Sequence, residues 1–290
     1  MLRKREIERV LVVGAGQMGH QIAMLCALGG YTTIIQDVNK EALQQAKKSL
    51  NKRMNHWVEQ GKITSVKKAE AFALLTFINN LEEAAQDVDL VIEAIVEKLN
   101  AKRELFQQLD LLTPKHTILA TNSSTIVNSL LAEVTERPEK VCNMHFFFPP
   151  LVMDCVEVVV SEKTSEETME TVMAVCKQIN RTGLLLRKEI SGFVANRILG
   201  AINREALALY EEGIADFKDI DIIVKKALRH PLGPFELIDL SGADVVYDVM
   251  ELRYAETGSS EDKPSISIEE KVKSGNLGRK TGQGFYSYSK

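Results

Sequence analysis

The stretch VLVVGAGQMG at residues 10–19 decides the fold, because an apolar run of strand character leads directly into a G-x-G-x-x-G turn. Gly14 permits the tight turn out of the strand, Gly16 lets a pyrophosphate approach the backbone, and Gly19 allows close packing of the following helix. The N–H groups at the start of that helix, residues 17–22, would supply donors and a positive dipole end to phosphate oxygens. Glycine-rich turns also join strands to helices where no ligand binds, so the motif alone leaves both interpretations open.

A second apolar strand, TTIIQ at 32–36, ends at Asp37, which lies 23 residues after Gly14. A carboxylate at this point accepts hydrogen bonds from the ribose hydroxyls and repels a 2′-phosphate, so it favours NAD over NADP. The alternative is that Asp37 is only a turn residue before 38–40. These features together predict an NAD site: a strand, a glycine turn, a helix, a second strand and an acid at its end. Its expected residues are Gly14, Ala15, Gly16, Gln17, Met18, Gly19 and Asp37.

The composition is that of an ordinary globular protein: 290 residues, 45% hydrophobic and 26% charged. A net charge of −4 argues against nucleic acid as the main partner. No apolar run is long enough to span a membrane, and the first residues lack the apolar core of a secretion signal, so we expect a cytoplasmic protein with no membrane partner. The four cysteines have no C-x-x-C spacing. We therefore expect buried thiols and no metal site.

Strand-like runs alternate with helical patterns through the first domain, expected over residues 1–188, and predict an α/β fold with a mostly parallel sheet. The expected strands are 9–13, 32–36, 75–78, 89–94, 117–121, 141–145, 156–160 and 183–187. The charged, proline-free stretch at about 40–72 is interpreted as a helical pair that bends at Gly61 and covers an extended ligand.

After Lys188 the character of the chain changes to helical periodicity, which predicts an all-helical second domain over 189–290. The expected helical stretches are 193–211, 216–228, 233–254 and 265–274. Proline and glycine mark breaks between and within them, at Pro231, Gly233, Pro234 and Gly242.

Three segments at the ends of expected strands carry chemical side chains: IEAIVEKLNAK at 92–102, ATNSST at 120–125 and MHFFFPP at 144–150. Ligands of open α/β sheets bind at the carboxyl ends of the strands. The second segment is equally explained as a helix N-cap. In the third, His145 is a candidate general base, because its ordinary pKa near 6.5 suits proton transfer at neutral pH.

Glu157 lies inside an apolar strand, where a carboxylate is costly unless it has a partner. His145 could be that partner, since a carboxylate that accepts the imidazole N–H orients the ring and stabilises the imidazolium. The alternative is that Glu157 lies on an exposed sheet edge and His145 is a satisfied core histidine.

The order of motifs from Gly14 to Tyr288 resembles the short-chain L-3-hydroxyacyl-CoA dehydrogenase family, which includes 3-hydroxybutyryl-CoA dehydrogenases. Besides the glycine turn, the resemblance rests on IEAIVE at 92–97, on ATNSS where the family usually has ASNTSS, on MHFF and on VEVV. It continues through GFVANR at 192–197, HPLGPFELIDLSG at 230–242 and GRKTGQGFY at 278–286. It covers essentially the whole chain. The resemblance implies a Rossmann-type first domain followed by the helical domain.

The resemblance implies a catalytic dyad of His145 and Glu157, with Ser124 and Asn196 hydrogen-bonded to substrate oxygens beside the reacting carbon. It also implies a homodimer formed through the second domain, whose apolar residues include Ile198, Leu199, Ile202, Leu207 and Leu209. The residues that it places near the nicotinamide cofactor are Asp37, Glu97, Lys102, Ser124 and Lys280, while Ser49 lies where a CoA-contacting serine would be.

The implied reaction is the reversible oxidation of a (3S)-hydroxyacyl-CoA by NAD. Two positions depart from the family pattern: Phe148 stands where the family has asparagine in HFFNP, and Asp154 replaces a lysine just before the dyad glutamate. Two rival hypotheses follow, a dehydrogenase of a small polar hydroxy acid such as gulonate, and an NAD-binding homologue that has lost efficient catalysis. The joint retention of Ser124, His145, Glu157 and Asn196 argues against the second.

Overall fold

The computed structural model describes residues 6–288, and the chain divides after Phe193 into two compact units, Met1–Phe193 and Val194–Lys290. The sequence had suggested a division at 188. Phe193 is fully buried, and its ring lies 5.5 Å from the ring of His145, so the turn that precedes the helical region packs with the first unit.

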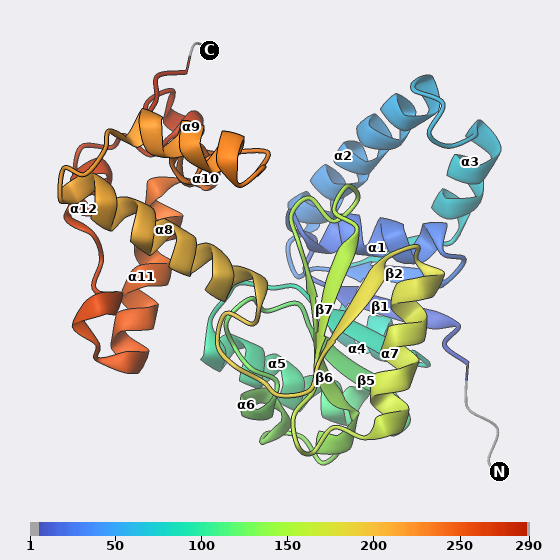
Figure 1. Cartoon of the computed structure of the whole chain (residues 1–290). Coiled ribbons are helices and arrows are strands. Elements are labelled where there is room, and N and C mark those ends of the chain that lie inside the picture. The colour runs from blue at the N-terminus through green and yellow to red at the C-terminus, as the bar shows by residue number, and fades with distance from the viewer. Residues whose placement is uncertain (1–5, 289–290) are drawn as a thin grey trace. The chain divides into compact units, whose positions relative to one another are not determined.

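The first unit is built on an eight-stranded sheet in the order β3-β2-β1-β4-β5-β6-β7-β8 (Figure 1). The strands are β1 (Arg9–Val13), β2 (Thr32–Gln36), β3 (Leu75–Ile78), β4 (Leu90–Glu93), β5 (Ile118–Thr121), β6 (Val141–Phe146), β7 (Cys155–Val159) and β8 (Thr182–Leu186). All neighbours are parallel except β6 and β7, which are antiparallel. The segment 147–154 between these two strands is too short for the crossover of about a dozen residues that a parallel connection needs. The predicted mostly parallel α/β sheet is confirmed.

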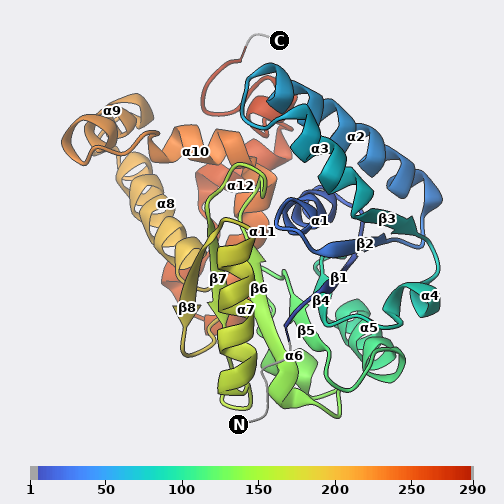
Figure 2. The same ribbon diagram turned by 90° about the vertical axis from the view of Figure 1, so that its right-hand side faces the viewer.

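Helices cover both faces of this sheet. They are α1 (Gly19–Leu28), α2 (Lys40–Glu59), α3 (Ser65–Ala73), α4 (Leu81–Ala85), α5 (Leu99–Leu112), α6 (Ser129–Ala132) and α7 (Glu166–Gln178), with a 3₁₀ turn η1 (Pro138–Lys140). Figure 2 shows α1 and α5 on opposite sides of the central strands β1 and β4. The alternation along β1 explains this: Val10 and Val12 pack under α1 and α7, whereas Leu11 and Val13 pack under α4 and α5. Strands buried on both faces are apolar throughout, as in the run VLVV.

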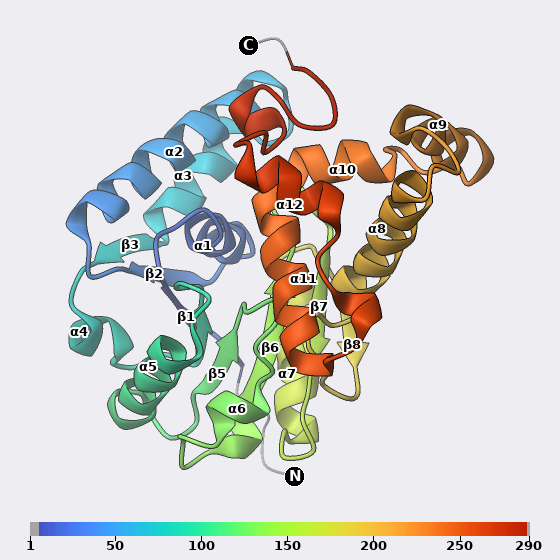
Figure 3. The ribbon, with the colours of Figure 1, turned by 90° about the vertical axis from the view of Figure 1, so that its left-hand side faces the viewer.

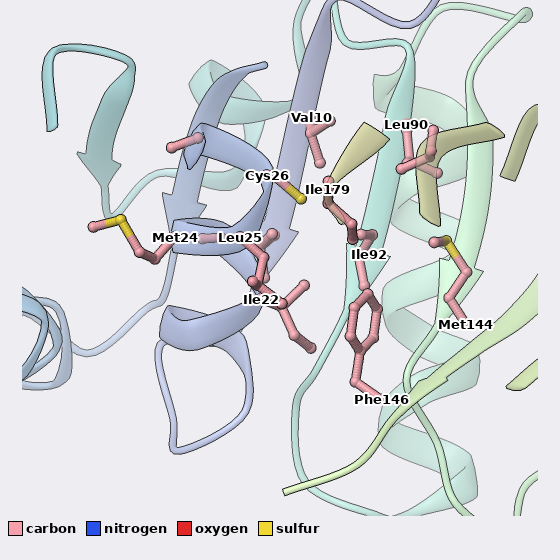
Figure 4. Packing of buried hydrophobic residues seen from close by; sticks show 14 of the residues in the cluster. Val10, Ile22, Met24, Leu25, Cys26, Leu90, Ile92, Met144, Phe146 and Ile179 are labelled. Carbon is pink, nitrogen blue, oxygen red and sulfur yellow. The ribbon is translucent and has the colours of Figure 1, made fainter. Parts of the chain in front are cut away.

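Figure 4 shows the core on the α1 side, where Ile22 and Cys26 of α1 lie near Val10, Ile92 and Phe146 of the sheet. Of the four cysteines, Cys26, Cys142 and Cys176 are buried and Cys155 is half-buried, all as free thiols. Burial raises the pKa of the Cys26 thiol to about 12. These thiols are packing groups.

The expected helical pair at 40–72 is formed by α2 and α3, joined at a tight bend (Figure 1). Asn39 begins α2 by accepting a hydrogen bond from the Ala42 N–H, and Thr64 begins α3 by accepting one from the Lys67 N–H. Gly61 between them has a φ of +68°, which glycine adopts without strain.

The second unit is helical, as Figure 3 shows in gold, orange and red. Its helices are α8 (Ala195–Glu211), α9 (Phe217–Ala227), α10 (Pro234–Ser241), α11 (Ala243–Thr257) and α12 (Ile266–Lys273), with 3₁₀ turns η2 (Ser260–Asp262) and η3 (Arg279–Thr281). The expected stretch 233–254 is two helices, because Gly242 between them has a φ of +107°. Within the described residues, no helix is long and apolar enough to cross a membrane.

Two buried carboxylates organise the second unit. Asp221 accepts hydrogen bonds from the N–H groups of Phe235 and Glu236, and Asp239 accepts them from the N–H groups of Phe285 and Tyr286. Tyrosine hydroxyls complete both sets: Tyr286 donates to Asp221 at 2.9 Å and Tyr288 donates to Asp239 at 3.0 Å. A Cβ atom on Gly284 would lie 2.0 Å from the Asp239 carboxylate, which explains the glycine in GQGFY.

Candidate active site

The glycine turn between β1 and α1 has the geometry that the sequence indicates. Gly14 has a φ of +104°, and a Cβ atom there would lie 2.6 Å from the carbonyl oxygen of Ala94. A Cβ atom on Gly19 would lie 1.8 Å from the Gly14 carbonyl oxygen. On Gly16, by contrast, it would meet nothing within 4 Å. The protein's own packing therefore requires glycine at 14 and 19, while the open space at 16 suits a ligand that approaches the backbone.

Asp37 follows β2 and lies against this turn. One carboxylate oxygen accepts a hydrogen bond from the Ala15 N–H at 2.8 Å, and the other accepts one from the Asn39 N–H at 2.9 Å. The side chain is half-buried. The N-cap residue of α1, Met18, makes no side-chain capping hydrogen bond, so the first N–H groups of the helix face the turn. An open glycine, an uncapped helix start and an acid at the end of β2 fit the adenosine and pyrophosphate parts of a dinucleotide.

His145 and Glu157 are paired by the antiparallel ladder of β6 and β7, in which they are direct register partners. The His145 Nδ1 atom lies 2.8 Å from a Glu157 carboxylate oxygen, and both residues are at least 95% buried. The rings of Phe147 and Phe193 lie 4.6 and 5.5 Å from the imidazole. Because Nδ1 faces the carboxylate, Nε2 is the ring nitrogen left to exchange a proton.

Ser124 is half-buried in the loop that follows β5. The loop is held by Glu97, whose carboxylate accepts hydrogen bonds from the Ser124 N–H at 3.0 Å and the Thr125 N–H at 3.1 Å. The Ser123 hydroxyl donates to the same oxygen. Burial opposes ionisation of Glu97, but the Lys102 ammonium and these donors outweigh it and lower the pKa of the carboxyl.

Lys102 has a side chain only 1% exposed, and its Nζ atom lies 2.6 Å from Glu93 and 3.2 Å from Glu97. Sequence reasoning assigned no role to Glu93, the last residue of β4, which is fully buried. The signal was available: Glu93 ends an apolar strand, and the cost of burying a carboxylate that singled out Glu157 applies to it equally.

The other expected residues are Ser49 in the first unit and Asn196 and Lys280 in the second. Ser49 is half-buried on α2 and accepts a hydrogen bond from the Gln45 amide at 3.4 Å. In the second unit, Asn196 is half-buried in the first turn of α8, and Lys280 binds Asp244 at 2.5 Å. Of the two departures from the pattern, Phe148 is 61% exposed and Asp154 is also exposed.

Comparison with known proteins decides the family. The model described as "3-hydroxyacyl-CoA dehydrogenase, NAD binding domain" matches residues 9–190, and the one described as "3-hydroxyacyl-CoA dehydrogenase, C-terminal domain" matches residues 192–288. The chain belongs to the 3-hydroxyacyl-CoA dehydrogenase family. As a member of this dehydrogenase family it is an NAD-dependent oxidoreductase, and the first unit is the NAD-binding one.

The relatives span the whole chain. A probable 3-hydroxybutyryl-CoA dehydrogenase of Bacillus subtilis is 40% identical over 98% of this chain and 98% of its own. A 3-hydroxybutyryl-CoA dehydrogenase of Clostridioides difficile is 37% identical over 97% of this chain and 100% of its own. Among solved structures, an (S)-3-hydroxybutyryl-CoA dehydrogenase of Ralstonia eutropha has a TM-score of 0.93 and 35% identity, and the match covers 98% of this chain and 100% of that one.

Within the described residues, no cluster of three or more histidine, cysteine or acidic side chains could hold a metal ion. The ion pairs of Lys102, the dyad of His145 and Glu157 and the loop that carries Ser124 lie instead at the carboxyl ends of β4, β5 and β6. These are the strand ends at which an open α/β sheet binds its ligands.

Proposed function

We propose that the protein interconverts (3S)-hydroxyacyl-CoA and 3-oxoacyl-CoA with NAD, and that its substrate is a short-chain thioester such as 3-hydroxybutyryl-CoA. The observation that carries this proposal is the buried contact of 2.8 Å between His145 Nδ1 and Glu157. An imidazole oriented by a carboxylate is a general base for a hydroxyl group. The names of the relatives in Bacillus subtilis and Clostridioides difficile support the short-chain substrate.

In the oxidation direction, Nε2 of His145 accepts the proton of the C3 hydroxyl as the C3 hydride leaves. Glu157 accepts the Nδ1–H and stabilises the imidazolium that forms. Bound NAD supplies the hydride acceptor. In the reverse direction, the imidazolium of His145 returns the proton to the C3 oxygen.

Two further residues position the substrate in this proposal. Ser124 and Asn196 hydrogen-bond the C3 oxygen and the thioester carbonyl. Such orientation lowers the activation barrier by several kcal/mol, and by about 7 kcal/mol or more in well-aligned systems. Gly16 and Asp37 hold the adenosine half of NAD, Glu97 and Lys280 lie beside its nicotinamide half, and Ser49 contacts CoA.

Substrate comparison tests the proposal. NADH oxidation is measured with acetoacetyl-CoA and with acetoacetate, and NAD reduction is measured with gulonate. We expect turnover with the CoA ester alone, and a kcat/KM that falls as the acyl chain of the 3-oxoacyl-CoA is lengthened. Oxidation of gulonate would support the small hydroxy-acid alternative. NADH binding without turnover of any of the three compounds would support a non-enzymatic homologue.

We also propose that the second unit forms a homodimer. Many of its apolar side chains are exposed on α8, α9 and α11, among them Ile198, Ile222, Ile223, Val245, Val249 and Leu252. Exposed apolar side chains that gather into one patch mark an interaction surface. Leu207, expected among the interface residues, instead lies in the unit's own core at 1% exposure. Light scattering after size exclusion would show twice the mass of the chain, and a monomer at micromolar concentration would contradict the proposal.

A further inference from the structure

The first turn of helix α1 departs from regular helical hydrogen bonding. In a regular helix each N–H donates to the carbonyl four positions before it, so the Gln21 N–H would bind the Gln17 carbonyl. Among the described residues, the Gln21 N–H donates instead to the Met18 carbonyl at 3.1 Å, and the His20 N–H reaches the Gly16 carbonyl only at 3.3 Å. The backbone of α1 therefore gives the Gly16 carbonyl one long hydrogen bond and the Gln17 carbonyl none.

Two neighbouring side chains of α1 supply donors to these carbonyl groups. The His20 Nδ1 atom lies 2.5 Å from the Gly16 carbonyl oxygen, and the Gln21 side-chain amide donates to the Gln17 carbonyl oxygen at 3.0 Å. Both side chains are buried, with 8% of His20 and 2% of Gln21 exposed. Each side chain thus binds the carbonyl four positions before it, which is the partner that its own N–H would have in a regular helix.

The chemistry of the two side chains determines which atom donates. A carbonyl oxygen only accepts, so the contact with Gly16 requires the proton to be on Nδ1. Burial lowers the pKa of His20, and hydrogen bonds to the backbone offset only part of this effect, so the ring is neutral near pH 7. The Gln21 amide is oriented by a second contact, because its oxygen accepts the Leu151 N–H at 3.5 Å. Neither side chain brings a charge to the turn. Each brings a hydrogen bond of defined direction.

The direction of these carbonyl groups sets the direction of the amides beside them. A trans peptide is planar, and its C=O and N–H point in opposite directions. The Gly16 carbonyl shares a trans peptide with the Gln17 N–H, and the Gln17 carbonyl shares one with the Met18 N–H. Both carbonyl groups point toward the side chains of α1, so both N–H groups point away from them. Within the part of the chain that the structure describes, neither N–H donates to a protein acceptor.

We propose that His20 and Gln21 are positioning residues for the pyrophosphate of NAD. Each holds one carbonyl group of the glycine turn, so that the N–H of the same peptide, at Gln17 or Met18, is directed at a phosphate oxygen. The assignment of this turn to the pyrophosphate rests on the proposed function, whereas the part of the two side chains rests on the contacts above. Backbone N–H groups at a helix start attract phosphate, and fixing their directions in advance increases the affinity.

A matched control lies at the other end of the same helix. The Gln178 side-chain amide donates to the carbonyl of Gly29, the C-cap residue of α1, at 2.8 Å. The side chain and the kind of hydrogen bond are those of Gln21, but this carbonyl is not part of the glycine turn. Gln178→Met therefore reports the effect of removing a glutamine-to-carbonyl hydrogen bond from α1 while the turn is unchanged.

The variants remove the donor and keep the approximate size of the side chain. His20→Leu and Gln21→Met remove it, whereas His20→Asn retains it, because the asparagine amide nitrogen lies at about the place of Nδ1. Binding of NADH and ADP-ribose, which contain the pyrophosphate, is compared with binding of adenosine, which lacks it. In His20→Leu and Gln21→Met we expect the affinities for NADH and ADP-ribose to fall about 10-fold, as when one hydrogen bond to a charged group is misdirected.

The controls separate this effect from a loss of packing. Adenosine affinity should stay within about twofold in every variant, because the turn amides do not touch it. His20→Asn and Gln178→Met should keep NADH affinity within about threefold of the wild type. In acetoacetyl-CoA kinetics, His20→Leu and Gln21→Met should raise the KM for NADH and leave kcat within about threefold, because His145 is untouched.

Amide NMR of the wild-type protein tests the proposal without any variant. ADP-ribose should shift the Gln17 and Met18 amide protons downfield, as hydrogen bonding to a phosphate does, and adenosine should not. In His20→Leu and Gln21→Met these shifts should be smaller. Wild-type protein saturated with ADP-ribose but without these shifts would overturn the proposal, so it stays testable if a variant does not fold.

Three results with the variants would also overturn the proposal. They are equal losses of affinity for adenosine and ADP-ribose, an equal loss in Gln178→Met, and the same loss in His20→Asn as in His20→Leu. If the wild-type protein binds NADH but turns over no CoA ester, the proposed function fails, while the binding and NMR measurements still test His20 and Gln21.

Discussion

Both units of the molecule bury carboxylates, but they give them different partners. In the first unit, Glu93 faces the ammonium of Lys102, and Glu157 faces the imidazole of His145. In the second unit, the partners of Asp239 in the described structure are backbone N–H groups and a tyrosine hydroxyl. Burial alone therefore does not mark a reactive carboxylate. The two sets differ in the partner, which is an ionisable side chain in the first unit and a neutral donor in the second.

The same difference is visible in the pKa values. Burial works against the Glu97 carboxylate, yet the Lys102 ammonium and the loop donors outweigh it and place the pKa below its ordinary value. Burial also disfavours the ionised form of Asp221. The neutral donors Phe235 and Tyr286 offset only part of this desolvation cost, so the pKa of Asp221 is raised. At Glu97 a cation and neutral donors together exceed the cost of burial, whereas at Asp221 the neutral donors do not.

The largest effect is expected at the His145–Glu157 pair, the carboxylate with an ionisable partner in the first unit. Replacing His145 with glutamine removes the ionisable partner, so turnover of acetoacetyl-CoA should fall by about 100- to 10,000-fold, the usual contribution of a general base. NADH affinity, measured by fluorescence titration, should change little, because the glycine turn is untouched. Turnover that survives within about threefold would contradict the dyad.

The next effect is smaller. Glu157→Gln keeps the shape of the side chain but removes the charge that stabilises the imidazolium, so kcat should fall by orders of magnitude yet less than for His145→Gln. Steady-state kinetics across pH measures it. An unchanged kcat would show that Glu157 is a structural carboxylate of the kind found in the second unit.

A third variant tests a carboxylate of the second unit that is bound by neutral donors. Asp239→Asn replaces acceptor oxygens that bind the N–H groups of Phe285 and Tyr286 with an amide that can satisfy only part of them. We expect a loss of about 1–3 kcal/mol in the free energy of unfolding, the cost of a buried group left without a partner. Urea denaturation measures it. Unchanged stability would show that the hydrogen bonds of Asp239 do not stabilise the second unit.

The smallest expected effect is the pH dependence of the contributions that Glu97 and Asp221 make to stability. Because the folded pKa of Glu97 lies below 4.5, its stabilising contribution is complete above that pH and is lost as the pH falls through the folded value. The folded pKa of Asp221 lies above 3.8, so its contribution is complete below that pH and is lost as the pH rises through the folded value. Carboxyl-carbon NMR titration, assigned with Glu97→Gln and Asp221→Asn, should show these opposite shifts. Shifts of the same sign would contradict the comparison.

Local sequence predicted the elements of the fold well, because apolar runs and their flanking turns depend on near neighbours. The strands 9–13, 32–36 and 75–78 coincide with β1, β2 and β3. The glycine turn and Asp37 were found for the same reason. The pair of His145 and Glu157 was inferred because a charge inside an apolar strand needs a partner, and the ladder of β6 and β7 brings one to it.

What the sequence did not reveal depends on residues that meet only in the folded chain. The hydrogen bonds of Glu97 reach a loop 27 positions away, and no periodicity marks them. Glu93 and Lys102 are nine positions apart across a strand end and a helix start, a spacing that belongs to neither regular period. Burial of Phe193 moved the division between the units, because a ring contact with His145 cannot be recognised from the segment itself.

The register of β6 and β7 has a consequence for how this enzyme can vary. His145 and Glu157 face each other because they are register partners in the ladder of β6 and β7, so their pairing does not depend on the exposed residues of the loop 147–154 that joins the strands. The exposed side chains of that loop can be exchanged while the two side chains remain in place, whereas Phe147 packs against the imidazole and Leu151 lies in the core. Phe148 and Asp154 both lie in it. The architecture thus separates a segment free to diversify toward new substrates from the pair that must stay fixed, and directed evolution of specificity can begin in this loop.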